Sequence, residues 1–461
     1  MHTSAVPPTP PSRWLDIKSG IVILDLLLLC AMLAWLPFDP MVNKGLAILI
    51  FIAILWLTEA VNITITAISI PVLATLLGVF DMSKSLTDFA NPVLFLFFGG
   101  FALAAALSKQ GLDTQIAGKV MQLAKGHLGW ASIVLFTITA ALSMWISNTA
   151  TAAMMMPLSL GMLKGLDVHK ERRTLVFVLL GVAYSASIGG IGTLVGSPPN
   201  AIAAAQMGLG FTDWLEFGIP VVIIFMPVGI GLLYWVTRPN LSHQVSTEQV
   251  TIEWTGQRKV TLAIFLTTVL LWIGSQPLAK ALGGIPQFDT LIAMGAILAI
   301  AVSRVASWDD INQNTDWGVL LLFGGGLTLG EILDRSGAAL WLGQQVAQWL
   351  QGASPLWILL AVAGFMVLLS EFASNTAAAA LLVPVFAAVA GRIGLPPELL
   401  VVTVAVAASC GFALPVATPP NALVYGTGRI APREMLRAGL ALDLVCVLDV
   451  TAGAWLLLSL H

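Results

Sequence analysis

Charged residues are scarce in this chain: aspartate, glutamate, lysine and arginine make up only 10% of its 461 residues. A soluble domain carries about 25% of these residues, because its water-facing surface must be polar. The hydrophobic share is 58%, and the mean hydropathy is +0.92. This balance excludes a soluble enzyme, a nucleic-acid-binding protein and a disordered chain. The net charge of −3 also provides no basic patch that would attract nucleic acid.

Cysteine and histidine are equally sparse. The five histidines lie in loops or near chain ends, and the three cysteines form no Cys-x-x-Cys pair. Neither residue type therefore indicates a disulfide framework, a zinc site or a haem centre. The Pro-rich start of the chain has no cleavage-site pattern, so we expect no removed signal peptide. The cysteines all fall in apolar runs: Cys30, Cys410 and Cys446.

Long apolar runs are abundant, and they predict an all-α polytopic membrane protein. Most runs match one bilayer span of about 20 residues, but four are longer: 130–163, 174–207, 354–390 and 397–428. Two of these carry a Ser-Asn-Thr sequence midway, and the other two contain Gly- and Pro-rich polar stretches. A helix can break inside a membrane only where protein or a water-filled cavity satisfies its backbone. Four broken elements favour the binding site of a transporter.

The second half of the sequence repeats the first. Four blocks recur in the same order at a nearly constant offset, which indicates an internal duplication. The matched blocks are VLFLFFGGFAL at 93–103 with VLLLFGGGLTL at 319–329, Ser147-Asn148-Thr149 with Ser374-Asn375-Thr376, Pro157 with Pro384, and Ser197–Asn200 with Thr418–Asn421. We expect four parts: 1–42 as an N-terminal tail and first span, 43–237 as the first repeat, 238–258 as a linker, and 259–461 as the second repeat.

Lysine and arginine predict the orientation, since cytoplasmic loops carry an excess of both. If the runs 130–163 and 354–390 are re-entrant hairpins and the N-terminus is cytoplasmic, sixteen of the 21 basic residues face inward. This arrangement gives eleven transmembrane spans plus two hairpins, a cytoplasmic linker and a C-terminus outside. Each repeat then has an odd number of spans, so the two repeats are expected to have inverted topology. The first hairpin would open inward and the second outward.

Each Ser-Asn-Thr sequence suits a hairpin tip that binds ions. The half-helix before Ser147 ends in free carbonyls, which together with the side chains of Ser143, Ser147 and Asn148 offer hard, neutral oxygen ligands for Na⁺. The half-helix after the tip begins near Thr149, and its free N–H groups and positive dipole end favour an anion. The second tip repeats this pattern: Ser370, Ser374, Asn375 and Thr376.

The Gly- and Pro-rich stretches are expected to supply the remaining wall of the site. A helix restarts at Pro198 in the first copy, because proline suits the first turn of a helix. The second copy is the stretch 411–421. The hydroxyls of Ser197 and Thr418 stand at the two restarts, where they either cap the helix or bind a ligand.

Other polar groups have plainer interpretations. An isolated Ser-Asn-Thr sequence in a membrane helix usually only forms hydrogen bonds to a neighbouring helix. The Gly-Gly pairs at 99–100 and 325–326 favour close helix packing. Intramembrane carboxylates are functional candidates by default. Glu371 precedes the second tip and either tunes that site or lines its vestibule, whereas Asp443 and Asp449 in the last span favour pairing or interface roles. No lysine or arginine lies within the four broken elements.

These motifs in combination resemble the divalent anion/sodium symporter family, which includes sodium-coupled dicarboxylate transporters. The resemblance rests on the two Ser-Asn-Thr sequences, each with a downstream proline, and on the two [Ser/Thr]-Pro-Pro-Asn loops. It implies a homodimer in which a transport domain moves against a scaffold, as in an elevator. It implies sodium-coupled uptake of succinate, malate or fumarate across the inner (plasma) membrane, and no enzymatic activity.

The resemblance also assigns roles to single residues. It implies one sodium site formed by Ser143, Ser147, Asn148 and Gly196, and a second formed by Ser370, Ser374, Asn375 and Ala417. It implies substrate contacts from Asn148, Thr149, Ser197, Asn375, Thr376 and Thr418. Ser370 stands where many relatives have threonine.

Several alternatives stay open at this point. An arsenite-permease type of anion transporter would share the architecture without a sodium requirement, and sulfate or citrate would need only modest pocket changes. An exchanger would carry basic residues at the sodium positions, and a proton-coupled carrier is a further option. An intramembrane enzyme would need a nucleophile–base pair or metal ligands at membrane depth, and the sequence offers none. A channel fits poorly, because hairpins that meet from both sides suit an occluded site.

Overall fold

The computed structural model describes residues 17–122, 126–164, 166–167, 170–244, 253–349 and 353–460. These residues form 22 α-helices and one short 3₁₀ helix, η1 (Thr87–Ala90). Nine helices in this part of the chain are long and apolar enough to cross a membrane. The prediction of an all-α protein with several membrane spans is therefore confirmed. The Pro-rich start, residues 245–252 of the predicted linker and His461 lie outside the described residues.

The helices fall on either side of the linker. Those before it are α1 (Ile17–Trp35), α2 (Pro40–Thr58), α3 (Ile63–Leu76), α4 (Met82–Ser85), α5 (Pro92–Lys109), α6 (Leu112–Met121), α7 (Leu128–Ser143), α8 (Asn148–Met162), α9 (Arg172–Gly190), α10 (Pro198–Met207) and α11 (Phe211–Thr237). Those after it are α12 (Gly256–Ile273), α13 (Ser275–Ala281), α14 (Phe288–Ser303), α15 (Trp308–Asn314), α16 (Trp317–Ser336), α17 (Ala338–Trp349), α18 (Pro355–Phe372), α19 (Asn375–Ala390), α20 (Pro397–Ala408), α21 (Pro419–Gly426) and α22 (Pro432–Leu460). Each of the four long apolar runs is divided between two helices.

Local sequence explains where the four runs break. The hydroxyl oxygens of Ser147 and Ser374 accept hydrogen bonds from backbone N–H groups of Ala150 and Ala377, which caps α8 and α19. Serine is a favoured N-cap because its side chain replaces a missing intrahelical acceptor. In the runs 174–207 and 397–428 the second helix, α10 or α21, begins with prolines in its first turn. Proline is tolerated there because the backbone N–H that it lacks would have no hydrogen-bond partner within the helix.

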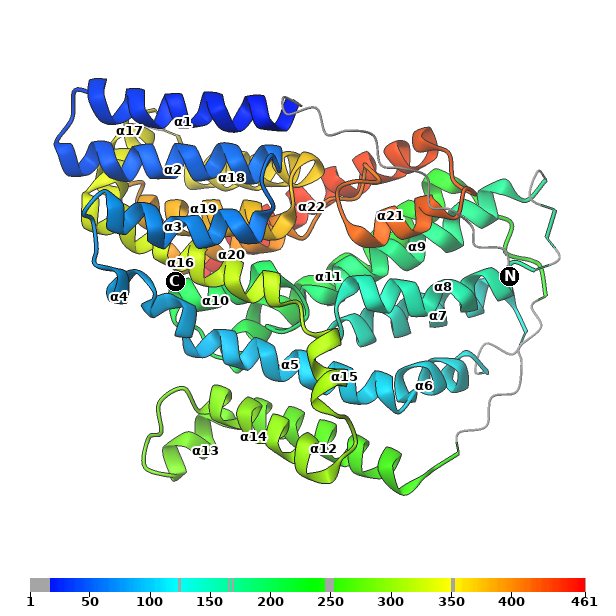
Figure 1. Ribbon diagram of the computed structural model, residues 1–461. Coiled ribbons are helices and arrows are strands. Elements are labelled where there is room, and N and C mark those ends of the chain that lie inside the picture. The colour runs from blue at the N-terminus through cyan, green and yellow to red at the C-terminus, as the bar shows by residue number, and fades with distance from the viewer. Residues whose placement is uncertain are drawn as a thin grey trace, which may run out of the picture.

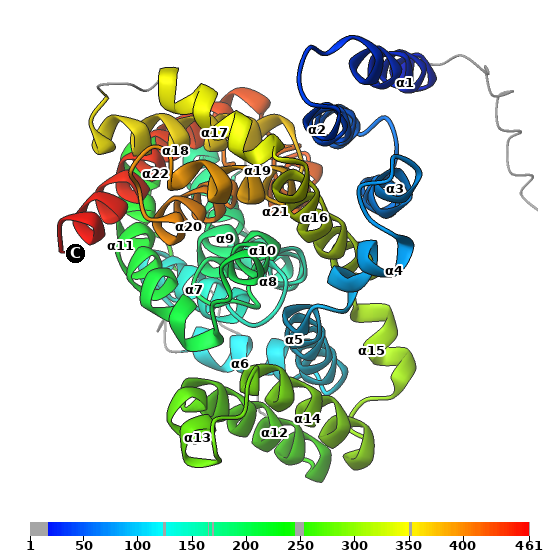
Figure 2. The ribbon, with the colours of Figure 1, turned by 90° about the vertical axis from the view of Figure 1, so that its left-hand side faces the viewer.

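The broken helices α7–α10 and α18–α21 form a central group together with α11 and α22, which pack against them. The remaining long helices flank this group. Figure 2 looks along most of the helices and shows α1–α3 on one side of this group and α12–α14 below it. In Figure 1 the pair α7–α8 lies toward the right of the molecule, and the pair α18–α19 lies toward the left. The two breaks, after α7 and after α18, therefore approach the middle of the protein from opposite ends.

The Gly-Gly pairs lie at close contacts, both between flanking helices and between a flanking helix and the central group. A Cβ atom on Gly99 of α5 would lie 2.6 Å from the Cβ of Ala293 on α14, and one on Gly325 of α16 would lie 2.8 Å from the Cβ of Ala67 on α3. The neighbouring glycines face inward, since a Cβ on Gly326 would lie 3.0 Å from the Cβ of Ala380 on α19. This confirms the predicted packing role, because small residues let membrane helices approach closely.

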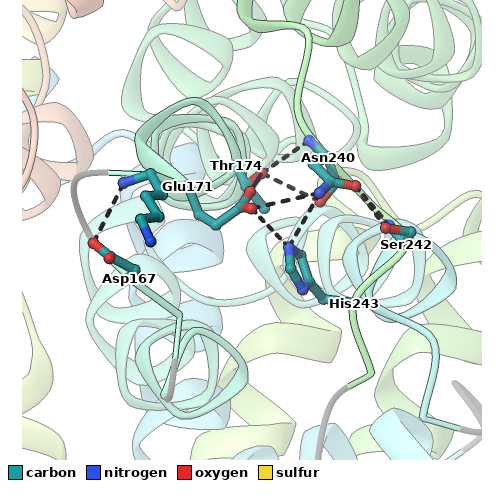
Figure 3. Close-up of polar contacts among 7 residues, drawn as sticks. Asp167, Glu171, Thr174, Asn240, Ser242 and His243 are labelled. Atoms are coloured by element: carbon teal, nitrogen blue, oxygen red, sulfur yellow. Dashed lines mark hydrogen bonds and ion pairs between the residues drawn. The ribbon is translucent and has the colours of Figure 1, made fainter.

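The chain after α11 is fastened to the central group. Figure 3 shows the Thr174 side chain of α9 beside the backbone of Asn240, where the hydroxyl donates over 3.2 Å and accepts over 2.9 Å. His243 Nε2 lies 3.1 Å from a Glu171 carboxylate oxygen, and its backbone carbonyl accepts from the N–H of Leu128 at the start of α7. The start of the linker thus holds the ends of α7 and α9 together.

Candidate functional site

The first break gathers three neutral oxygen atoms. The Ser143 hydroxyl, at the end of α7, lies 2.6 Å from the side-chain oxygen of Asn148, which begins α8. The same hydroxyl lies 2.7 Å from the backbone carbonyl oxygen of Ala186 in α9. A hydroxyl has one proton, so it can donate to only one of these two oxygens at a time. The cluster therefore has surplus oxygen lone pairs, which suit a hard cation.

The second break repeats this geometry. The Ser370 hydroxyl in α18 lies 2.8 Å from the side-chain oxygen of Asn375 and 2.9 Å from the carbonyl oxygen of Ala408 in α20. Ser370, like Ser143, is fully buried. The duplication seen in sequence thus produces two chemically equivalent oxygen clusters, one in each half.

Two buried asparagines brace the loops that face these clusters. The Asn200 side-chain amide donates to the carbonyl oxygens of Gly190 and Thr193 over 2.9 and 2.8 Å. The Asn421 amide donates to those of Gly411 and Leu414 over 3.1 and 3.0 Å. The side-chain oxygen of each asparagine is buried and accepts no hydrogen bond in the described structure. An unpaired buried acceptor is costly, and a bound cation would satisfy it.

The glycines of the loops permit the close approach of the chain. A Cβ on Gly196 would lie 2.5 Å from the carbonyl oxygen of Gly190, so only glycine fits there. A Cβ on Gly411 would lie 2.9 Å from the Ser370 hydroxyl oxygen and 3.2 Å from the Cβ of Ala417. The positions expected at the two sodium sites, Gly196 and Ala417, therefore lie in tightly packed loops beside the oxygen clusters.

The residues of the two Ser-Asn-Thr tips, expected to contact sodium or substrate, differ in exposure. Ser147 and Thr149 are exposed at the first break, and Asn148 is half-buried. At the second break Ser374, Asn375 and Thr376 are all half-buried. The second tip is therefore more enclosed than the first in this conformation.

The hydroxyls of Thr418 and Ser197, at the starts of α21 and α10, make different contacts. The Thr418 oxygen accepts from the N–H of Asn421 over 3.3 Å and so caps α21. Ser197 makes no such cap, and its hydroxyl lies 3.2 Å from that of Ser409 in the other half of the chain.

The short restarted helix of each half packs against the other half. Helix α21 packs against α8 and α9, and α10 packs against α19 and α20. Each tip thus lies beside the restarted helix of the opposite half.

Two buried carboxylates hold the second loop and have no equivalent in the first. The Glu371 carboxylate accepts hydrogen bonds from the N–H groups of Ala413 and Leu414 over 2.9 and 2.7 Å. Asp443 of α22 accepts from the N–H of Phe412 over 3.1 Å. Met144 occupies the position in the first half that Glu371 occupies in the second. Glu371 is therefore bound to the loop backbone in this conformation rather than lining an open vestibule.

A cavity of about 330 Å³ reaches the first tip from the side of α5 and α6. It is lined by Ser108, Asp113, Ser147, Pro157 and Asn314, among others. Lys109, which follows the lining residue Ser108 in α5, forms a 2.8 Å ion pair with Asp310 of α15. The Lys109 ammonium holds the pKa of the Asp310 carboxyl down at about 2, so this carboxyl is ionised at neutral pH.

The comparisons with known proteins place this geometry in a family. A model of the citrate transporter family, CitMHS, matches residues 53–406, which is most of the chain. The chain belongs to this family. It is therefore a membrane transporter and not an enzyme, as predicted from its sequence.

The chain is also similar in sequence to other transporters and in fold to one solved structure. An uncharacterized transporter of Haemophilus influenzae is 49% identical over 447 residues, covering 95% of this chain and 97% of its own. The sodium-dependent dicarboxylate transporter SdcS of Staphylococcus saprophyticus is 31% identical, covering 95% and 91%. The YdaH transporter of Alcanivorax borkumensis has a similar fold, with a TM-score of 0.57 at 16% identity, over 84% of this chain and 88% of its own.

Sequence reasoning overlooked several members of the two clusters. The carbonyls of Ala186 and Ala408 have no side-chain signature, so no motif points to them. Asn200 and Asn421 were visible as the last residue of each [Ser/Thr]-Pro-Pro-Asn loop, but only their hydrogen bonds show that they brace the carbonyls beside each break.

Proposed function

We propose that the protein is a sodium-coupled symporter of dicarboxylates of the succinate, malate and fumarate class. The observation that carries this proposal is the pair of equivalent oxygen clusters, Ser143–Asn148–Ala186 and Ser370–Asn375–Ala408. Each joins a hydroxyl, an amide oxygen and a helix carbonyl without a fixed charge, which is the donor set that a small alkali cation requires. The name of the SdcS relatives supports the same substrate class.

In this proposal the bound sodium ions offset the negative charge of the dicarboxylate. A dianion near the middle of a bilayer costs several kcal/mol unless its charge is offset. The four broken elements contain no lysine or arginine, so helix dipoles, hydroxyls and amides must hold the anion together with bound sodium ions. Two sodium ions would neutralise a dicarboxylate and would also order the loops around Asn200 and Asn421. By linkage, each ligand then raises the affinity for the other.

The proposed residue roles follow the two clusters. Sodium ions would be held by Ser143, Ser147, Asn148 and Gly196 on one side, and by Ser370, Ser374, Asn375 and Ala417 on the other. The substrate carboxylates would meet Asn148, Thr149, Ser197, Asn375, Thr376 and Thr418. The capping bond of Thr418 shows that its hydroxyl oxygen is already an acceptor, so its proton remains available to an anion.

We also propose eleven membrane crossings and two re-entrant hairpins, with the repeats inverted. In this topology the pairs α9–α10 and α20–α21 each cross once, the shorter apolar helices α3 and α14 cross as well, and α7–α8 and α18–α19 are the hairpins. Their placement toward opposite ends in Figure 1 supports the inversion. The protein would lie in the inner (plasma) membrane as a homodimer, and the central group would move as an elevator against the flanking helices.

Citrate is a second candidate substrate, because the family model that matches the chain is named for citrate transport. One experiment separates the two. The purified protein in liposomes is tested for uptake of labelled succinate under an inward sodium gradient, with choline replacing sodium in the control. Malate, fumarate, citrate and sulfate are then added as competitors. Uptake that is equal in sodium and choline would reject sodium coupling, and competition by citrate alone would favour the second candidate.

A further inference from the structure

A large apolar groove lies on the surface of the central group and ends beside the first break. It has a volume of about 670 Å³ and runs between α7 and α11 over the ring of Phe177 in α9. We call it the α7–α11 groove. It is open to the membrane-facing surface, since Ile133, Ile223 and Tyr234 on its walls are 45%, 65% and 50% exposed.

The absence of a side chain at Gly231 leaves open space in the groove. Gly129 of α7 and Gly231 of α11 both line it. A Cβ on Gly231 would meet no atom within 4 Å, so the space beside it is empty rather than filled by a neighbour. The lining is almost entirely aliphatic and aromatic, so a dicarboxylate would lose its hydration there without finding partners.

The groove spans one leaflet of the bilayer. Its walls extend along α7 from Gly129 to Met144, a rise of roughly 22 Å at 1.5 Å per residue. Half of a hydrocarbon core that is about 30 Å thick is shorter than this length. At the Gly129 end, Trp130, Tyr234 and Trp235 are 53%, 50% and 66% exposed. Exposed tryptophan and tyrosine side chains mark the membrane interface, so the opposite end, at Met144, lies deep in the membrane.

A basic residue stands at the interfacial end. Arg238 directly follows α11, and its N–H donates to the carbonyl of Tyr234 over 2.7 Å. Arg238 is exposed, and among the described residues no ion pair joins it to an acidic side chain. Glu171, whose carboxylate contacts Asn240 two residues further on, is already engaged by His243, as Figure 3 shows. Arg238 is therefore available to an anionic group at the level of the lipid headgroups.

We propose that the α7–α11 groove binds one acyl chain of an anionic phospholipid whose phosphate pairs with Arg238. The apolar lining, the depth and the exposed Arg238 that follows α11 together match a lipid with a charged head and a long chain. The end of that chain would contact Met144, the residue that follows Ser143 at the first break. The inference does not depend on which anion or cation the protein transports.

The test uses the full-length protein in vesicles of phosphatidylcholine and phosphatidylglycerol. A trace of phosphatidylglycerol with a photoactivatable group at the end of one chain is crosslinked, and the labelled peptides are mapped. We expect label to concentrate on the segments of α7 and α11 around Met144 and Met226. Gly231→Trp, which fills the groove, should lower this label at least about tenfold, since several buried methylene groups lose their contacts. Gly295→Trp is the matched control, because its glycine is exposed on α14 and also has free space; it should leave the label unchanged.

The headgroup is tested separately. Arg238→Gln should reduce the preference for the phosphatidylglycerol probe over its phosphatidylcholine counterpart about fivefold. Thr137→Trp, on the opposite wall, repeats the filling test in case Gly231→Trp does not fold. Equal label on α12 and α14, or label unaffected by either filling variant, would mean bulk lipid only and would overturn the proposal. Displacement by a free fatty acid but not by excess phosphatidylglycerol, or crosslinks to a second protein copy, would also overturn it.

Discussion

The hydroxyl of Ser143 lies 2.6 Å from the side-chain oxygen of Asn148, across the break between α7 and α8. Ser370 and Asn375 have the same relationship at 2.8 Å across the break between α18 and α19. In both pairs the serine lies in the last turn of one half-helix and the asparagine begins the next. The bond therefore fixes the shape of the break and directs oxygen lone pairs to one point.

Replacing either serine by alanine should weaken sodium binding. Ser143→Ala or Ser370→Ala removes one oxygen from a cluster and the hydroxyl that orients the asparagine. We expect the sodium concentration for half-maximal uptake to rise about fivefold, the factor that one hydrogen bond of roughly 1 kcal/mol represents. Ser132→Ala is the control, because Ser132 is equally buried in α7 but bonds only to its own helix at Leu128. A rise of equal size in the control would point to a general loss of packing instead.

Glu371 should matter through the loop that it holds. Glu371→Gln turns one acceptor into a donor and leaves the N–H of Ala413 or Leu414 without a partner. An unsatisfied buried group costs about 1–3 kcal/mol, so thermal stability should fall and uptake should be lost. Glu331→Gln is the matched control, since the Glu331–Lys84 ion pair is exposed to solvent and exposed ion pairs contribute little to stability. Unchanged melting and uptake in Glu371→Gln would show that the loop needs no carboxylate.

Much of the architecture was predictable because duplication and helix breakers leave their marks in the sequence. The paired Ser-Asn-Thr tips and the restarts at Pro198 and Pro419 stand where the helices break. The bracing role of Asn200 was not predictable, because its partners are backbone carbonyls that carry no sequence signal. The α7–α11 groove could not be predicted from the sequence either. It depends on the open space beside Gly231, which only the packing of the helices shows.

The glycines beside the clusters should tolerate no side chain. A Cβ on Gly411 would lie 2.9 Å from the Ser370 oxygen, so Gly411→Ala should displace that hydroxyl. We expect uptake to require a higher sodium concentration, while the melting temperature changes little. Gly391→Ala, just past the end of α19, meets nothing within 4 Å and is the control. The two variants are compared by uptake at several sodium concentrations and by thermal melting. If Gly411→Ala behaves like Gly391→Ala, the second cluster does not bind the coupling ion.

The proposed inversion makes a prediction about which side of the membrane two exposed segments face. Glu253 lies before α12 and Lys280 lies in α13, after that helix has crossed. Each is replaced by cysteine in a background in which the exposed Cys30 is serine; Cys410 and Cys446 are buried and stay. A membrane-impermeant maleimide added to intact cells should label Lys280→Cys and not Glu253→Cys, whereas inverted vesicles should give the reverse. The basic residues of the first half and the linker lead to this expectation, because they are retained in the cytoplasm. Labelling of both cysteines from the same side would place an even number of crossings between them and would remove the basis for inverted repeats.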